Sequence, residues 1–216
     1  MIPMKKQITR FLTLLTMFFG MSAFAQPGAF HDSRDKVSVR VVVEPEQVIP
    51  GSDLIIAVVL DHETHWHTHT NNPQVPEALG DAEDYIATEI LFETPENSPL
   101  IIHDGFMQWP EPVIVEVAFV GEPVDYGVFA DETVVYIPVT ISKEAEIGTT
   151  TFTVRTIFQA CDDTSCMAPT PQAGQGTRWD EYGIEMSVTI VSPDNAGGTV
   201  VYSELFNGFE SSVFGA

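Results

Sequence analysis

Apolar and polar positions alternate along most of the chain with a period of two. This period places successive side chains on opposite faces of an extended chain, so it predicts β-strands. The runs are rich in β-branched and aromatic residues, and Gly, Pro, Asn or Asp bound them, as is typical of strands. The predicted strands are residues 37–43, 53–60, 86–92, 113–120, 133–141, 150–158 and 184–191.

At least seven short strands without a strong helical pattern predict an all-β fold, an immunoglobulin-like antiparallel β-sandwich. The Cys and Trp positions differ from the antibody pattern, so only the sandwich class is implied. Residues 71–84 and 93–112 indicate longer, proline-rich excursions, and long loops on a rigid sandwich are where function usually lies. We expect the sandwich domain to span residues 37–191. The C-terminal tail, 192–216, suits either a flexible end or a short helix packed on the sandwich.

The first 25 residues are typical of a secretory signal peptide. Lys5, Lys6 and Arg10 precede a short apolar stretch, and residues 23–25 (Ala-Phe-Ala) fit the cleavage rule. The apolar stretch is too short for a comfortable membrane span, and no later segment is long and apolar enough. We therefore expect a signal peptide at 1–25 and an exported mature protein without a membrane span, most simply periplasmic.

The chain is strongly acidic, with 31 Asp and Glu against 9 Lys and Arg and a formal net charge of −22. Cleavage of the signal peptide would remove basic residues only, so the mature protein would be still more acidic. Such a surface repels phosphate backbones and anionic lipids. We therefore expect no nucleic-acid partner and no binding to membrane surfaces.

The only two cysteines, Cys161 and Cys166, are separated by four residues late in the chain. In an oxidising compartment they can form one disulfide across a short loop. A domain of this size hardly needs such a cross-link, because closing so short a loop contributes only about 2 kcal/mol. Asp162 and Asp163 oppose thiolate formation, which suits a pair that reacts only when a partner docks. From the residues alone, redox exchange and a structural disulfide stay about equally open.

A histidine cluster at residues 62–69 is a second candidate site. On a strand, His65, His67 and His69 would point to one face and could ligate copper or zinc, with the cysteines as further ligands in principle. The alternative is a solvated polar strand on which Trp66 faces the core, and the periodicity favours it for at least part of the run. No motif of a serine nucleophile, a phosphate-binding loop or a dinucleotide site is present, and nothing demands a cofactor.

Three segments share their order and approximate spacing with the motifs of a known family. Residues 65–73 have the sequence His-Trp-His-Thr-His-Thr-Asn-Asn-Pro, residues 109–112 are Trp-Pro-Glu-Pro, and residues 158–169 begin Phe-Gln-Ala-Cys and end Cys-Met-Ala-Pro. They are similar to segments Trp-His-x-Tyr-Trp-x-Asn-Pro, Trp-Pro-x-Pro and aromatic-Gln-x-Cys…Cys-x-x-Pro. With these motifs, residues 37–191 resemble the N-terminal periplasmic domain of DsbD-type thiol:disulfide interchange proteins, the disulfide bond corrector family.

The resemblance implies an immunoglobulin-like sandwich with a redox-active cysteine pair, one component of a protein-disulfide reductase. In the family, a membrane-embedded domain reduces the pair, which then reduces periplasmic acceptors such as disulfide isomerases. Carried over here, Cys161 and Cys166 are the catalytic residues. Cys166 would attack the acceptor disulfide, and Cys161 would resolve the mixed disulfide. Trp66 and His67 match the family's Trp-His pair, which favours a structural role for the histidine cluster over a metal site.

The chain departs from the family at His69, where the family has Tyr, so this segment is more polar than usual. The family's membrane domain and thioredoxin-like domain do not follow in this chain. The expected partners are therefore periplasmic thiol–disulfide proteins and a separate membrane reductant. Two other functions stay open: a non-catalytic interaction domain with a structural disulfide, and a periplasmic copper or zinc protein that uses His65, His67 and His69.

Overall fold

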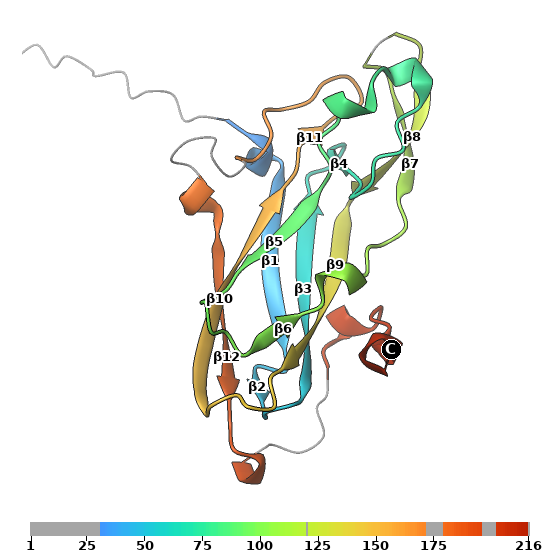
Figure 1. Cartoon of the computed structure of the whole chain (residues 1–216). Helices are drawn as coiled ribbons and strands as arrows, with labels where there is room; N and C mark the ends of the chain where they lie inside the picture. Colours follow the sequence, from blue (N-terminus) through green and yellow to red (C-terminus); the bar gives the residue numbers. More distant parts are fainter. Residues whose placement is uncertain (1–30, 120, 172–178, 196–201, 216) are drawn as a thin grey trace, which may run out of the picture. The chain divides into compact units, whose positions relative to one another are not determined.

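The computed structural model describes residues 31–119, 121–171, 179–195 and 202–215 (Figure 1). The predicted signal peptide, residues 1–25, lies outside these ranges. The described residues form β-strands and short 3₁₀-helices, with no α-helix among them. None of the described helices is long and apolar enough to cross a membrane.

Twelve strands are found among the described residues, and all seven predicted strands are confirmed, some with shifted ends. The strands are β1 Val37–Glu44, β2 Gln47–Val48, β3 Asp53–His62, β4 His67–His69, β5 Glu89–Glu93, β6 Leu100–Ile102, β7 Val113–Val117, β8 Val124–Ala130, β9 Glu132–Ile141, β10 Gly148–Ile157, β11 Ala160–Cys161 and β12 Ile184–Ile190. The 3₁₀-helices are η1 Ser33–Asp35, η2 Glu77–Leu79, η3 Ala82–Asp84, η4 Asp104–Phe106, η5 Trp179–Tyr182, η6 Pro193–Asn195, η7 Glu204–Phe206 and η8 Ser211–Gly215.

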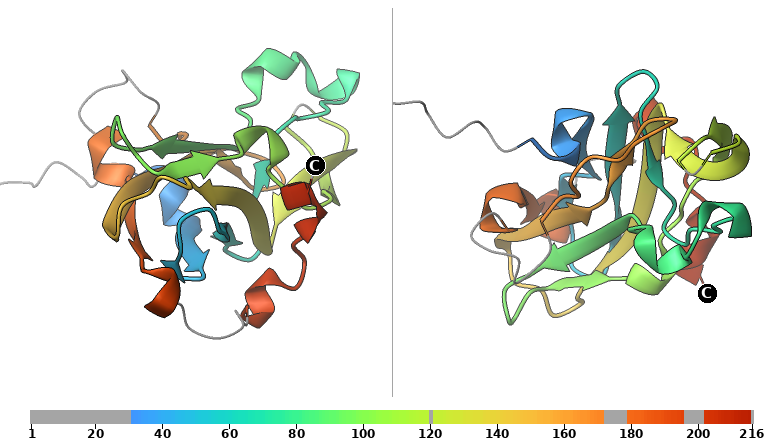
Figure 2. Two further views of the ribbon diagram at one scale, coloured as in Figure 1. Left: turned by 60° about the horizontal axis from the view of Figure 1, so that its bottom comes forward. Right: turned by 90° about the horizontal axis from the view of Figure 1, so that it is seen from above.

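The strands form three four-stranded sheets, in the orders β1-β3-β9-β6, β2-β12-β10-β5 and β11-β4-β8-β7. Strand pairs within them are antiparallel, except that β2 runs parallel to β12. The first two sheets enclose the main hydrophobic core, to which both contribute buried side chains (Figures 1 and 2). The predicted all-β, immunoglobulin-like β-sandwich is therefore confirmed.

Strand β3 explains why one predicted run is apolar at almost every position. Alternate residues from Leu54 to Leu60 face the main core, whereas Ile55 and Ala57 face the opposite side and pack with Phe206. A strand that is buried on both faces has no polar face to present, so it loses the alternation of a half-exposed strand. The continuous apolar run is thus the signature of a central strand.

Residues 202–215 of the C-terminal tail pack on the outer face of the sheet that contains β3. Phe206 is buried there, and Tyr136 Oη donates a hydrogen bond to Leu205 O at 2.7 Å. Of the two alternatives for the tail, a short helix on the sandwich fits these residues.

Two parts of the sandwich differ from the prediction. Strand β8 was not predicted, because Gly127 interrupts its apolar pattern and glycine is depleted in strands. The site of a Cβ on Gly127 would lie 3.4 Å from the Pro112 side chain. The excursion predicted at 93–112 contains β6, a strand of three residues that pairs with β9 and is too short to show a period.

Candidate functional site

The two cysteines form a disulfide at the β11 edge of the sheet β11-β4-β8-β7. Cys161 ends β11 and pairs antiparallel with Cys166 across the intervening turn. The two residues differ sharply in exposure: Cys161 is fully buried, with 0% of its surface accessible, and Cys166 is exposed. A reactant in solution can therefore reach one half of the disulfide and not the other.

The turn between the cysteines is organised by Asp162. Its Oδ1 accepts hydrogen bonds from the N–H groups of Thr164, at 2.9 Å, and Ser165, at 2.7 Å, and from both hydroxyls at 3.1 Å. Burial by itself would raise the pKa of Asp162, but these hydrogen bonds outweigh it and hold the pKa below its ordinary value. The turn is therefore fixed in shape and carries a permanent negative charge beside the exposed cysteine.

An N-terminal segment ties both ends of the cysteine loop together. Ser33 N and Ser33 Oγ donate hydrogen bonds to Ala168 O, at 2.9 and 2.7 Å, and Ser33 Oγ accepts one from Ala160 N at 2.8 Å. Met167 N also donates to Ala160 O at 2.8 Å. Residues that flank the two cysteines are thus held at fixed positions by one buried serine.

The histidine of β4 that contacts the disulfide is His69. It is 1% exposed, and its Nε2 lies 3.6 Å from Cys161 Sγ, while its Nδ1 lies 3.2 Å from Tyr126 Oη. Its ring packs edge-on against Tyr85, with ring centres 5.1 Å apart. Burial and, to a lesser extent, the neighbouring His67 together lower the pKa of His69 to about 4, against a hydrogen bond with Gln159, so the imidazole is neutral at neutral pH.

His67 shares this face of the sheet. It lies directly opposite Cys161 in the pairing of β4 with β11, and directly opposite residues of neighbouring strands point to the same side. His67 is 2% exposed, and its Nε2 has no hydrogen-bond partner among the described residues. Burial lowers the pKa of His67 to about 4, against the opposing charges of Asp163 and Asp162.

Both sequence interpretations of the histidine cluster were wrong in part. His65 is exposed and precedes β4 in a left-handed conformation with φ 69°, so it does not share a face with His67 and His69. The solvated polar strand is also wrong, because all three residues of β4 are buried. Strand β4 lies between β11 and β8, and the rings of Phe119, Tyr85 and Tyr126 pack against its two histidines. Trp66 does pack against the main core, as that alternative predicted.

The sequence singled out the two cysteines, which the structure joins in a disulfide, but it did not indicate the aromatic residues around them. Phe158, the aromatic residue next to the loop in sequence, is buried in the main core. The rings around His69 come instead from Tyr85 and Tyr126, which lie far from the cysteines in the chain. Tyr126 belongs to the unpredicted β8, so no local signal in the sequence could have placed it.

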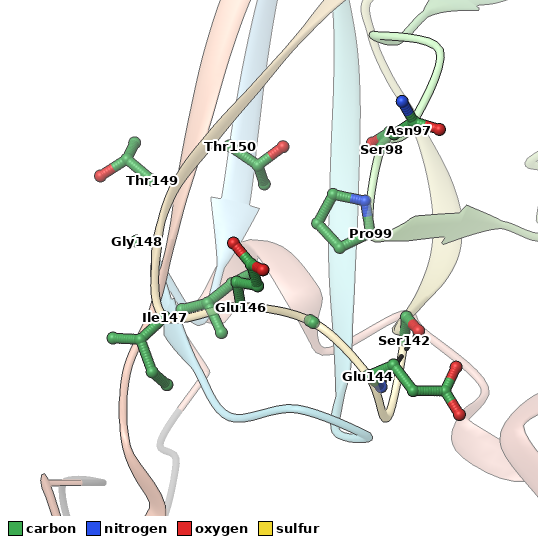
Figure 3. Close-up of a pocket in the computed structure, with 12 residues that line it drawn as sticks. Asn97, Ser98, Pro99, Ser142, Glu144, Glu146, Ile147, Gly148, Thr149 and Thr150 are labelled. Carbon is green, nitrogen blue, oxygen red and sulfur yellow. Dashed lines mark hydrogen bonds between the residues drawn. The ribbon is translucent and has the colours of Figure 1, made fainter.

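One hollow in the surface lies away from this cluster. It has a volume of about 580 Å³ and lies between residues 97–99 and residues 142–150 (Figure 3). Glu144 N donates a hydrogen bond to Ser142 Oγ at 3.2 Å within its lining. None of the lining residues is a histidine or a cysteine. The hollow offers no chemistry for the disulfide, so we place the candidate site at the cysteine loop.

Comparison with known proteins finds no matching family model and no matching curated protein. Similar solved structures include the N-terminal periplasmic domain of ScsB from Proteus mirabilis, at 17% identity and a TM-score of 0.37, over 72% of this chain and 46% of that one. They also include the N-terminal domain of DsbD from Neisseria meningitidis in the reduced form, at 11% identity and a TM-score of 0.35, over 72% of this chain and 86% of that one. The chain resembles a DsbD-type N-terminal domain. This agrees with the resemblance in the sequence motifs.

A third similar structure is a family 123 glycoside hydrolase from Clostridium perfringens, at 8% identity and a TM-score of 0.33, over 71% of this chain and 27% of that one. The chain spans less than half the length of the ScsB chain. At such identities and TM-scores these likenesses carry no argument about function. One cysteine pair, present as a disulfide beside a buried histidine, fits thiol–disulfide exchange on its own chemistry.

Proposed function

We propose that the protein is an exported thiol–disulfide exchange module that passes electrons to periplasmic disulfide-containing partners through Cys161 and Cys166. The observation that carries this proposal is the unequal exposure of the two residues. Exchange requires one sulfur that partners can reach, and the burial of the second sulfur directs partners to the first and protects the second from them.

In the proposed reaction, the thiolate of reduced Cys166 attacks the disulfide of an acceptor. The acceptor's S–S bond breaks, a mixed disulfide forms at Cys166, and one acceptor sulfur leaves as a thiol. The thiolate of Cys161 then attacks Cys166 Sγ, which re-forms the internal disulfide and releases the second acceptor thiol. Two electrons pass to the acceptor, and the burial of Cys161 supports its role as the resolving residue.

His69 is suited to move the proton of Cys161 in the second step. Its Nε2 lies 3.6 Å from Cys161 Sγ, and a neutral imidazole can accept a thiol proton as the nucleophile forms. Tyr126 Oη contacts the other ring nitrogen and fixes the orientation of the ring. Proton transfer at the buried sulfur would then need no water.

The negative charge of the turn supports a cysteine pair that reacts only when a partner docks. Ionised Asp162 lies next to Cys161 in sequence and within the loop that carries Cys166, and a neighbouring anion disfavours the thiolate. A partner that brings positive charge or hydrogen-bond donors to this loop would reverse that effect on docking. Exchange would therefore be slow with small thiols and faster with a fitting protein.

Each segment of the chain has a role in this function. Residues 1–25 would direct export, residues 37–191 would form the exchange domain, and residues 192–216 would form its tail. The mature protein would work in the periplasm. A separate membrane reductant would return electrons to the pair after each cycle.

The deciding experiment is the reduction potential of the Cys161–Cys166 pair, measured in graded thiol buffers with alkylation and a mass shift as the readout. A potential above about −300 mV supports exchange, because structural disulfides of exported proteins usually lie below that value. A potential clearly below it would contradict the proposal and favour an interaction domain with a structural disulfide.

A further inference from the structure

We propose that the reduced Cys161–Cys166 pair and His69 together bind one thiophilic metal ion, Cu(I) or Zn(II), and that the disulfide closes this site. The inference goes beyond electron transfer, although both need a pair that can be reduced. It concerns a different set of atoms from the three-histidine face considered in the sequence, because His65 is not part of it.

The ligand atoms are already gathered. His69 and the two cysteines each offer one ligand atom, and these atoms all lie within 4.8 Å of one another. The cysteines are separated by four residues, which falls within the Cys-x₂₋₄-Cys spacing of zinc sites. Two thiolates and an imidazole are the soft and borderline ligands that select Cu(I) and Zn(II).

The second contact of His69 fits a metal ligand. Metal-binding histidines usually donate the other ring N–H to a fixed acceptor, which sets the tautomer. Here Nε2 faces Cys161 Sγ, and Nδ1 lies 3.2 Å from Tyr126 Oη, which can accept that N–H. The ring of Tyr85 packs against His69 and limits its rotation. The imidazole is therefore already oriented toward the sulfurs by side chains that belong to other strands.

Neighbouring groups restrict the choice of metal. Ca²⁺ and Mg²⁺ require several oxygen ligands, but the nearby carboxylate of Asp162 already accepts four hydrogen bonds within its turn. Three protein ligands leave one coordination position open, and one of the three ligands, Cys166, lies at the exposed side of the cluster, where solvent reaches it. An ion could thus enter and leave without opening the sandwich.

The state of the cysteines controls the site. A disulfide offers no thiolate, so the ligand set is complete only after a dithiol donor or a phosphine transfers two electrons to the pair. Metal binding then forms two metal–sulfur bonds and one metal–nitrogen bond, and it releases the two thiol protons. Oxidation of the pair by an acceptor disulfide would send two electrons to the acceptor and release the ion. Metal binding and electron transfer would therefore exclude each other.

The test is an anaerobic titration of the full chain with Cu(I), and separately with Zn(II), against a chromophoric chelator. The phosphine-reduced protein should take up one ion with at least about tenfold higher affinity than the oxidised protein, as expected for the loss of metal ligands. Uptake of only one of the two metals would identify the ion. Equal binding by the reduced and oxidised proteins would overturn the proposal, and so would the absence of binding by the reduced protein.

Two variants test the role of the histidine. His69→Gln keeps a polar side chain beside Tyr126 but removes the imidazole, so affinity should fall at least about tenfold. His65→Asn is the matched control, because it removes an exposed histidine of the same segment and Asn tolerates its left-handed conformation. Wild-type affinity in folded His69→Gln would contradict the proposal. If that variant does not fold, X-ray absorption of the loaded wild-type protein decides, because the site requires a nitrogen ligand beside the sulfurs.

The metal site and the exchange function can fail separately. Exchange is measured with a chelator present, so it does not depend on metal. Metal binding is measured after reduction by a phosphine, so it does not require a potential in the exchangeable range.

Discussion

At the scale of single residues, the two cysteines are chemically unequal, and this inequality can be measured. In Cys161→Ser the remaining thiol is the exposed Cys166, whereas in Cys166→Ser it is the buried Cys161. We expect alkylation of Cys161→Ser to be at least about tenfold faster, because reactivity follows access and thiolate fraction. Mass spectrometry after timed alkylation measures both rates.

The same pair of variants tests the order of steps. Cys161→Ser should accumulate a mixed disulfide with an acceptor, and Cys166→Ser should not. Each variant serves as the control for the other, since both lack the cross-link and should lose about the same 2 kcal/mol. Equal alkylation rates would contradict the inequality of the two cysteines. A mixed disulfide that accumulates only in Cys166→Ser, through Cys161, would reverse the assigned roles.

The buried histidines predict a specific dependence of stability on pH. Burial lowers the pKa of His67 and of His69 from 6.5 to about 4, so between these pH values the unfolded chain binds more protons than the folded one. The free energy of unfolding must therefore rise with pH in that window and fall as the solution is acidified from pH 7 to pH 4. The two groups interact, and a combined loss of a few kcal/mol is expected at pH 4.

Chemical denaturation at pH 7, 5.5 and 4 would measure this loss. His69→Gln should show a shallower decrease, since one of the protons is gone, and His65→Asn should keep the wild-type slope. Burial also lowers the pKa of His62, which every variant retains, so His62 contributes equally to each curve and the comparison isolates His69. Hydrogen bonds hold the pKa of Asp162 below its ordinary value, so its contribution is lost mainly as the pH falls further. A wild-type slope in His69→Gln would contradict the buried, neutral state of His69.

At the scale of elements, η1 and β11 are joined through one hydroxyl. In Ser33→Ala the buried Ala160 N–H would lose its acceptor and Ala168 O would lose one of its donors. An unsatisfied buried backbone group costs about 1–3 kcal/mol, so the variant should unfold more easily. Ser38→Ala, at an exposed position of β1, is the matched control and should change stability by less than about 0.5 kcal/mol.

Hydrogen exchange would show whether the effect of Ser33→Ala is local. The amides of Ala160 and Met167 should exchange faster in this variant than in Ser38→Ala, because both belong to the loop that Ser33 ties down. Unchanged exchange at both amides would mean that the loop is held by other contacts.

The elements also show what the sequence could and could not predict. Long strands such as β3 and β10 were predictable because their apolar residues follow the positions that are buried in the sandwich. The site was predictable only as far as the cysteines, which are recognisable by type and spacing. The burial of His67 and His69 was not predictable, because a polar alternation looks the same on a solvated strand and on one against which aromatic rings pack. Contacts between β4 and β8 depend on long-range pairing, which leaves no local pattern.

At the scale of the whole molecule, the buried apolar side chains form three separate clusters, and the C-terminal segment contributes to the third. The main core lies between the first two sheets, and a second cluster forms around Leu79, Val117, Tyr126 and Val128. The third cluster joins Phe206 to the outer face of β3. The second cluster includes Tyr126, the contact of His69, whereas the third shares no buried residue with the cysteine loop. Stability and redox chemistry should therefore separate in variants of the tail.

Phe206→Ala tests this separation. Phe206 is 4% exposed, and truncation of a buried Phe costs about 3–5 kcal/mol, so the free energy of unfolding should fall by that order. Phe106→Ala is the matched control, because Phe106 is 55% exposed and its truncation should cost less than about 0.5 kcal/mol. The reduction potential of the cysteine pair should be the same in both variants as in the wild type, since neither side chain touches β11 or His69 among the described contacts. A shift of about 30 mV or more in folded Phe206→Ala corresponds to about 1.4 kcal/mol and would mean that the outer face of β3 is coupled to the disulfide.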